Sequence, residues 1–171
     1  MRPGRWARFP GFRGSGRDDL DERFAISLKA ALYGTWPSFW TMSAAQRPAS
    51  AIELAESALE VALAEAEVGY RSRSPLKIRQ AAEKAWLAAN LATDHAMEKH
   101  GRSPEAGPSA HTARHEFLEA LGEYTLSEKL GYFADRLHGD CFYQGSCPTE
   151  DGMRRALAGV REYIRRLKDE V

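Results

Sequence analysis

The sequence SPLKIRQAAEKAWLAANLATDHAMEKH, from Ser74 to His100, is the longest uninterrupted helical pattern in the chain and decides the predicted fold. Ser74 can cap the helix start, and Pro75 suits the first helical position because its missing N–H would have no partner there. Small and apolar side chains recur every three or four residues: Ile78, Ala81, Ala82, Ala85, Ala89, Ala92 and Ala96. A helix apolar over so much of its surface must be covered on more than one side. We therefore expect it to be the central helix of a bundle.

The rest of the chain after residue 49 is also predicted to be helical. Ser50 and Glu53 form a capping box that opens a helix to about residue 70, and Thr125 and Glu128 form a second one that opens a helix ended by Gly145. Further helical patterns cover residues 112–121 and the segment from Thr149 to the C-terminus. No segment alternates with period two for long enough to be a strand. The sequence therefore predicts an all-α fold, an antiparallel up-and-down bundle of four to five helices over residues 50–171.

Residues 1–49 are predicted to be an N-terminal extension. Arg, Gly and Pro dominate the segment before Asp18, which cannot bury a core, so we expect disorder to about residue 17. A short amphipathic helix follows, and Pro37 ends it. Trp36, Phe39 and Trp40 then form an aromatic group that one bundle cannot fully cover, which together with the alanine-lined central helix predicts a homodimer. An alternative is that Met42 is the true start, which leaves open whether residues 1–41 are translated.

Composition limits the class of protein. The chain has 171 residues, 43% of them apolar and 28% charged, which is ordinary for one globular domain. No apolar run is long enough to span a membrane, and the N-terminal segment lacks the apolar core of a secretory signal, so we expect a cytoplasmic protein. The 24 basic and 24 acidic side chains cancel. This balance argues against a strong sequence-independent nucleic-acid binder, although residues 1–41 carry a local excess of positive charge.

Three segments together resemble a known family. They are AAEKAWLAA from Ala81 to Ala89, a helix introduced by a His-containing turn, and ADRLHGDCFYQG from Ala134 to Gly145. These segments resemble the archaeal PaREP proteins, a branch of the HEPN (higher eukaryotes and prokaryotes nucleotide-binding) superfamily. The resemblance covers residues 50–171 and implies an antiparallel helical bundle that commonly dimerises. Some proteins of this superfamily are ribonuclease toxins, and others are partners of minimal nucleotidyltransferases.

The resemblance also implies a test for catalysis. Ribonucleases of that superfamily carry an Arg four to six residues before a His on one helix, so that both converge on a phosphodiester. None of the five histidines of this chain has an Arg at that distance. Arg136 and His138 are only two residues apart, and side chains at that spacing diverge on a helix. We therefore expect ribonuclease activity to be absent and treat a degenerate ribonuclease that uses these two residues as the alternative.

One set of polar residues could converge between helices. Glu83 interrupts the apolar central helix, and a carboxylate that is partly buried there needs a charged or donor partner. We expect it either to mark a solvated edge with Lys84 or to reach Arg136 or His138 across the bundle. The complete candidate pocket for a ligand or partner is Glu83, Lys84, Arg136, His138, Asp140 and Tyr143.

The cysteines and the remaining histidines give weaker signals. Cys141 and Cys147 lack the second ligand pair of a structural zinc site, so they are either two small core residues or a disulfide. A disulfide is uncommon in the cytosol outside hyperthermophiles. His111 and His115 lie four residues apart without a third ligand, and we interpret them as solvated side chains near a helix start. The sequence thus predicts no metal site and no cofactor.

Two functional classes remain. The first is a non-catalytic HEPN-like binding module that contacts a nucleotide, RNA or a protein such as a minimal nucleotidyltransferase in a toxin–antitoxin-like pair. The second is the degenerate ribonuclease with Arg136 and His138 as its catalytic residues. The absence of the Arg–His spacing favours the first class.

Overall fold

The computed structural model describes residues 49–104, 107 and 109–169. By its contacts the chain divides into two units, residues 1–48 and 49–171. The predicted amphipathic helix and the aromatic group around Trp36 lie outside the described residues. In the part described there are five helices and no strand, which confirms the predicted all-α bundle.

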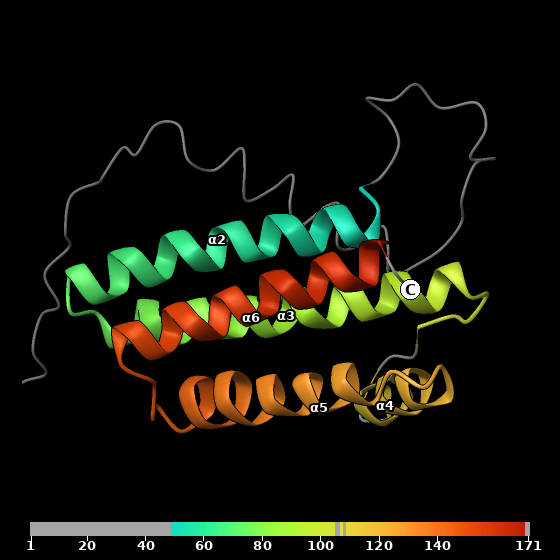
Figure 1. Ribbon diagram of the computed structural model, residues 1–171. Helices are drawn as coiled ribbons and strands as arrows, with labels where there is room; N and C mark the ends of the chain where they lie inside the picture. Colours follow the sequence, from blue (N-terminus) through green and yellow to red (C-terminus); the bar gives the residue numbers. More distant parts are fainter. Residues whose placement is uncertain (1–48, 105–106, 108, 170–171) are drawn as a thin grey trace, which may run out of the picture. The chain divides into compact units, whose positions relative to one another are not determined.

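Four long helical segments alternate in direction, as Figure 1 shows: α2 (Ala51–Arg71), α3 (Pro75–Lys99), α5 (Tyr124–Phe133) with its continuation η2 (Ala134–Tyr143), and α6 (Glu150–Asp169). The short helix α4 (Ala110–Ala120) lies in the connection between α3 and α5. Because α3 packs against every other helix, it is the central helix that the sequence predicted. None of the described helices is long and apolar enough to cross a membrane.

Alanines make the α2–α3 contact unusually close. Ala55 and Ala62 of α2 and Ala85 and Ala89 of α3 are fully buried, and their small side chains let the two helix backbones approach. At the end of this contact a Cβ on Gly69 would lie 2.8 Å from Ile78 Cγ1 and 3.0 Å from the backbone N of that residue. Only glycine fits there. The remaining core is made of larger side chains from α4, α5, η2 and α6.

The predicted caps of the first two helices are confirmed. Ser50 Oγ accepts the N–H of Glu53 while the Glu53 carboxylate accepts the N–H of Ser50, at 3.4 and 2.7 Å. Ser74 Oγ accepts the N–H of Lys77, with Pro75 in the first turn. These bonds satisfy backbone donors that the first turn of a helix leaves without a partner.

The predicted capping box at Thr125 is wrong. The helix begins at Tyr124, and its N-cap residue Glu123 makes no side-chain cap bond. Ser127, within the predicted box, instead bonds to side chains of α4, as described below. The glutamate of the box, Glu128, is exposed on the first turn. Because the helix begins one residue before Thr125, this threonine lies inside the first turn and cannot be its N-cap.

The second half of this helix departs from α-helical geometry. From Ala134 to Tyr143 the segment η2 is a π-helix, whose hydrogen bonds run from residue i to i+5. Each turn therefore takes more residues than in an α-helix. The apolar face nevertheless stays inward, with Leu130, Leu137 and Cys141 fully buried.

Candidate functional site

The predicted contact between α3 and the late helix exists. Glu83 Oε2 of α3 lies 2.6 Å from His138 Nδ1 of η2, and each side chain is about one third exposed, at 35% and 31%. The imidazole also packs among aromatic rings: Trp86 at 5.7 Å, Tyr143 at 4.7 Å and, stacked, Phe142 at 6.1 Å between ring centroids. The carboxylate and the rings fix the position of His138 between the two helices.

The other members of the predicted set do not join this contact. Lys84 turns to α2, where its Nζ lies 2.8 Å from both carboxylate oxygens of Glu65. Arg136 binds Asp140 within η2, at 2.6 Å and on the exposed surface. The set of six residues therefore divides into three separate groups, and the prediction of one convergent pocket is wrong.

Helix geometry explains the division. Arg136 and Asp140, four residues apart, lie on one side of η2, whereas His138 contacts Phe142 and Tyr143 at i+4 and i+5 on another side. Similarly, adjacent residues of α3 point in directions about 100° apart, so Glu83 faces η2 while Lys84 faces α2. Neighbours in the sequence thus contact different helices.

A second polar group connects α4 to α5. His115 Nδ1 lies 2.7 Å from Ser127 Oγ, which donates to Glu119 Oε1 at 3.1 Å. A nucleophilic serine must pass its proton to a histidine that an acid orients, but here the serine stands between the histidine and the acid. Ser127 is also only 5% exposed. This order and this burial fit a link between helices rather than a hydrolase site.

His111 and His115 are only partly solvated, whereas the sequence had suggested solvated side chains. Their rings meet edge to face at 4.5 Å, and the His111 ring lies 5.4 Å from Trp86. Within the described residues His111 Nδ1 is buried without a hydrogen-bond partner. Burial, followed by the charges of His115 and Arg114, lowers the pKa of His111. The α4 register directs His111 toward Trp86 of α3 and His115 toward Ser127 of α5, while both side chains keep intermediate exposure.

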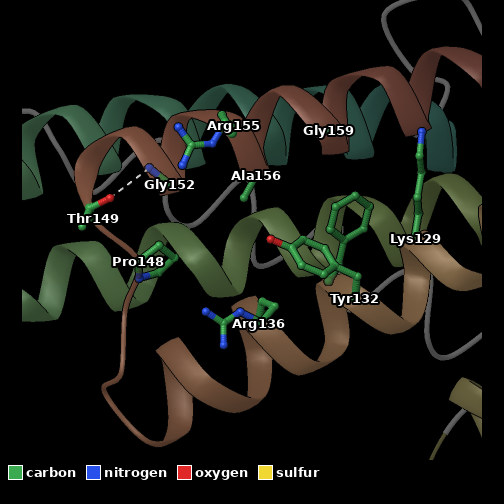
Figure 2. A pocket seen from close by; sticks show the side chains of 10 residues that line it. Lys129, Tyr132, Arg136, Pro148, Thr149, Gly152, Arg155, Ala156 and Gly159 are labelled. Atoms are coloured by element: carbon green, nitrogen blue, oxygen red, sulfur yellow. Dashed lines mark hydrogen bonds between the residues drawn. The ribbon is translucent and has the colours of Figure 1, made fainter.

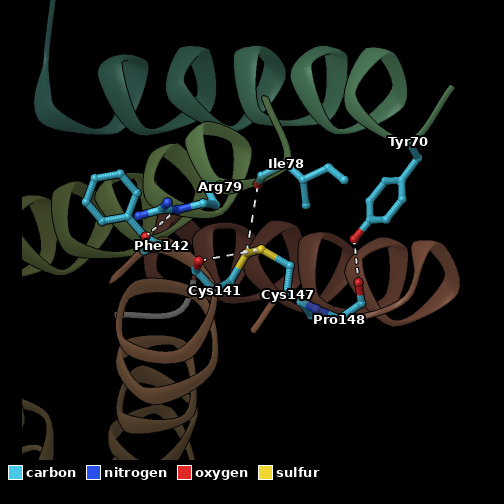
Figure 3. Close-up of a disulfide and its surroundings, with 7 residues drawn as sticks. All are labelled: Tyr70, Ile78, Arg79, Cys141, Phe142, Cys147 and Pro148. Carbon is cyan, nitrogen blue, oxygen red and sulfur yellow. Dashed lines mark hydrogen bonds between the residues drawn. A yellow bond between two sulfur atoms is a disulfide. The ribbon is translucent and has the colours of Figure 1, made fainter. Parts of the chain in front are cut away.

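The two cysteines are joined to each other rather than to the histidine groups described above. Cys141 and Cys147 form a disulfide that joins η2 to the connection before α6 (Figure 3). The same connection is held by Tyr70, whose hydroxyl donates to Pro148 O at 2.6 Å. In the part of the chain that the structure describes, no three His, Cys, Asp or Glu side chains are grouped as metal ligands.

A separate concave surface lies between α5–η2 and α6. This cleft of about 570 Å³, which we call the cationic cleft, is lined by Lys129, Tyr132, Phe133, Arg136, Pro148, Thr149, Gly152, Arg155, Ala156 and Gly159. Figure 2 shows Arg136 and Arg155 at the same end of the cleft as Pro148, with Tyr132 and Lys129 toward the other end.

The sequence explains why this surface is hollow. On α5 and η2 the lining residues follow one another at spacings of three and four, from Lys129 to Arg136, so they share a face. The opposing face of α6 repeats small residues at the same spacing, namely Gly152, Ala156 and Gly159. Two helices with large side chains at these positions would close the gap. Here the small residues of α6 leave a groove beneath the long side chains.

The charge of the cleft is one-sided. Three of its ten lining residues are cations and none is acidic. Among the described residues neither Lys129 nor Arg155 has a carboxylate within ion-pair distance. Arg136 binds Asp140, but both side chains are well exposed, at 51% and 31%, and a surface pair of this kind contributes about 0–1 kcal/mol. An anionic ligand could therefore compete for the guanidinium.

Two aromatic rings and a helix start complete the cleft. Tyr132 is 52% exposed and meets the buried Phe133 edge to face at 5.9 Å. Thr149 Oγ1 accepts the N–H of Gly152 at 3.2 Å and so caps the first turn of α6, whose dipole favours a nearby negative charge (Figure 2). The cleft therefore combines an exposed aromatic ring with three cationic side chains and the N-terminus of α6.

Sequence reasoning identified Arg136 but missed Lys129, Tyr132 and Arg155. The signal that could have revealed them is the cation–aromatic face from Lys129 to Arg136 opposite a glycine–alanine face on the last helix. Comparison with known proteins found no family model, no curated protein and no solved structure that matches this chain. The site is therefore interpreted from its geometry.

Proposed function

We propose that this bundle is a non-catalytic binding module whose cationic cleft takes a phosphate-bearing ligand, a nucleotide or a segment of single-stranded RNA. The observation that carries the proposal is a concave surface with three cations and no acidic lining residue. In this proposal the phosphates contact Arg136, Arg155 and Lys129, while a base stacks on Tyr132. The HEPN-like character expected from the sequence is consistent with such a ligand.

Catalysis has less support in the geometry. The degenerate ribonuclease needs Arg136 and His138 at one phosphodiester. Arg136 lines the cationic cleft, whereas His138 binds Glu83 among the rings between α3 and η2. An acid–base pair must reach the same proton-transfer site, so this division favours binding without cleavage.

Three further expectations belong to the proposal. A homodimer is proposed from the alanine-lined central helix and the aromatic group around Trp36, and a minimal nucleotidyltransferase as partner is proposed from the family resemblance alone. A cytoplasmic location is proposed with them. Intracellular disulfides persist mainly in hyperthermophiles. The disulfide between Cys141 and Cys147 therefore fits a cytoplasmic location best if the organism is a hyperthermophile.

Equilibrium binding of fluorescent ATP and of a labelled single-stranded RNA of about eight nucleotides tests the proposal. A charge-assisted hydrogen bond to phosphate contributes about 1.5–3 kcal/mol, so Arg155→Gln should weaken binding by about 10- to 100-fold. Arg161→Gln is the matched control, since Arg161 lies on the same helix but in a groove beside α2. Three phosphate contacts with RNA should also give a slope of about −2 in a plot of log K against log salt concentration.

The two ligands give distinguishable results. Binding of ATP with an affinity equal to that of the RNA indicates a mononucleotide site, whereas tight binding of the RNA alone indicates a strand-binding site. Equal weakening by Arg155→Gln and Arg161→Gln, or no binding of either ligand at millimolar protein, would refute the cleft as the binding site.

A further inference from the structure

A second groove is bordered by one cysteine of the disulfide. It has a volume of about 320 Å³ and is lined by Tyr70, Arg73, Pro75, Ile78, Arg79, Gly145 and Cys147. Cys141 is fully buried, whereas Cys147 is partly exposed and reaches this groove. Figure 3 shows the disulfide between η2 and the connection to α6, with Arg79 and Ile78 of α3 beside it. Cys147 therefore borders the groove, whereas Cys141 does not.

The groove selects for negative charge. Two of its seven lining residues are arginines and none is acidic. Arg79 Nε donates to Phe142 O at 2.6 Å, which fixes the side chain and leaves its terminal N–H groups available. Arg73 has a left-handed backbone, with φ of 52°, at the turn between α2 and α3. One-sided charge in a groove raises the local concentration of a small anion.

We propose that Cys147 is a thiol-exchange site for a low-molecular-weight thiol that bears a carboxylate. The thiolate attacks the Cys147 sulfur from the groove, a new sulfur–sulfur bond forms there, and the bond to Cys141 breaks. The bonding pair leaves on the Cys141 sulfur, which takes up the proton that the incoming thiol released. The products are a mixed disulfide on Cys147 and a free thiol at Cys141, so the atoms and electrons balance.

The bundle should stay folded through this exchange. The disulfide closes a loop of only six residues in sequence separation, and short loops gain the least from a cross-link. The connection retains the hydrogen bond from Tyr70 to Pro148 O and that from Ser146 N to Asp140 O, at 2.6 and 2.8 Å. The exchanged form can therefore be studied as a native protein.

The test uses the oxidised full chain with three probes: 3-mercaptopropionate, 2-mercaptoethanol and cysteamine, which are anionic, neutral and cationic. Intact mass gives the rate of mixed-disulfide formation, expressed per thiolate and divided by the rate of the same thiol with hydroxyethyl disulfide. Chymotryptic cleavage after Phe142 or Tyr143 separates the two cysteines and locates the adduct. We expect the adduct on Cys147 and a preference of about tenfold or more for the anionic over the cationic probe.

Two variants decide whether the groove causes the preference. Arg73→Asn removes the charge but tolerates the left-handed backbone, and it should reduce the preference about fivefold. Arg71→Asn makes the same charge change at an exposed position outside the groove and should leave the preference unaltered. An adduct on Cys141, a chain that forms no disulfide in air, or equal normalised rates for the three probes would overturn the proposal.

Discussion

The buried hydrogen bond between Thr93 of α3 and Tyr163 of α6 makes a sharp prediction about stability. The two hydroxyl oxygens lie 2.7 Å apart, and both residues are fully buried. Thr93 Oγ1 also donates to Ala89 O at 2.9 Å, so its proton is used and the tyrosine hydroxyl must be the donor in the pair. Burial raises the pKa of Tyr163, which keeps this donor protonated in alkaline solution as well.

The two single substitutions should therefore differ. Tyr163→Phe leaves Thr93 with its hydrogen bond to Ala89 O and should lower the free energy of unfolding by about 1 kcal/mol. Thr93→Val leaves the tyrosine O–H buried without an acceptor and should lower the free energy of unfolding by more, about 2–3 kcal/mol. In the double variant no donor is left unpaired, so it should be no less stable than Thr93→Val alone.

Urea unfolding followed by circular dichroism gives the free energies, with an unchanged m-value as the condition for comparing them. Tyr132→Phe is the control, because Tyr132 is 52% exposed and the loss of its hydroxyl should change stability by about 0.5 kcal/mol or less. Additive effects in the double variant, or a larger loss for Tyr163→Phe than for Thr93→Val, would refute the assigned direction of the hydrogen bond.

Three further predictions follow from the fold. Gly69→Ala should destabilise the protein to urea by about 1–3 kcal/mol, because overpacking against Ile78 exceeds the gain in helix propensity of about 1 kcal/mol. Acid should destabilise the fold as pH falls below about 6.5, since burial lowers the pKa values of His95 and His111 and the unfolded chain then binds more protons. Thermal unfolding between pH 7.5 and 5 checks this sign, and His111→Phe should flatten the profile. Equilibrium sedimentation at micromolar concentration should show a dimer, and a pure monomer would contradict that expectation.

The helices could be predicted because their signals are local. A serine cap followed by Pro75 and a stripe of alanines at helical spacing needs no knowledge of the rest of the chain, and α3 begins where this pattern begins. The box at Thr125 failed because the helix begins one residue earlier, at Tyr124, which places Thr125 inside the first turn. The contact of Ser127 with His115 is set by tertiary packing, and no local pattern contains that information.

The candidate site was predictable only in part. A contact of Glu83 with Arg136 or His138 was one of two expectations, because a partly buried carboxylate needs a partner, and the structure shows the contact with His138. The π-helical turns of η2 were not expected, whereas the divergence of Arg136 and His138, two residues apart on one helix, was. The cationic cleft depends on which face of α6 opposes α5, and that orientation is a property of the packed bundle.

A nitrogen–proton correlation NMR titration of the labelled protein with ATP and with the short RNA tests the central claim most directly. If the cationic cleft binds phosphate, the amide signals of Tyr132, Gly152 and Arg155 should move in a saturable manner, while those around Glu83 and His138 stay in place. Saturable movement centred on His138, or no movement at millimolar ligand, would contradict the account.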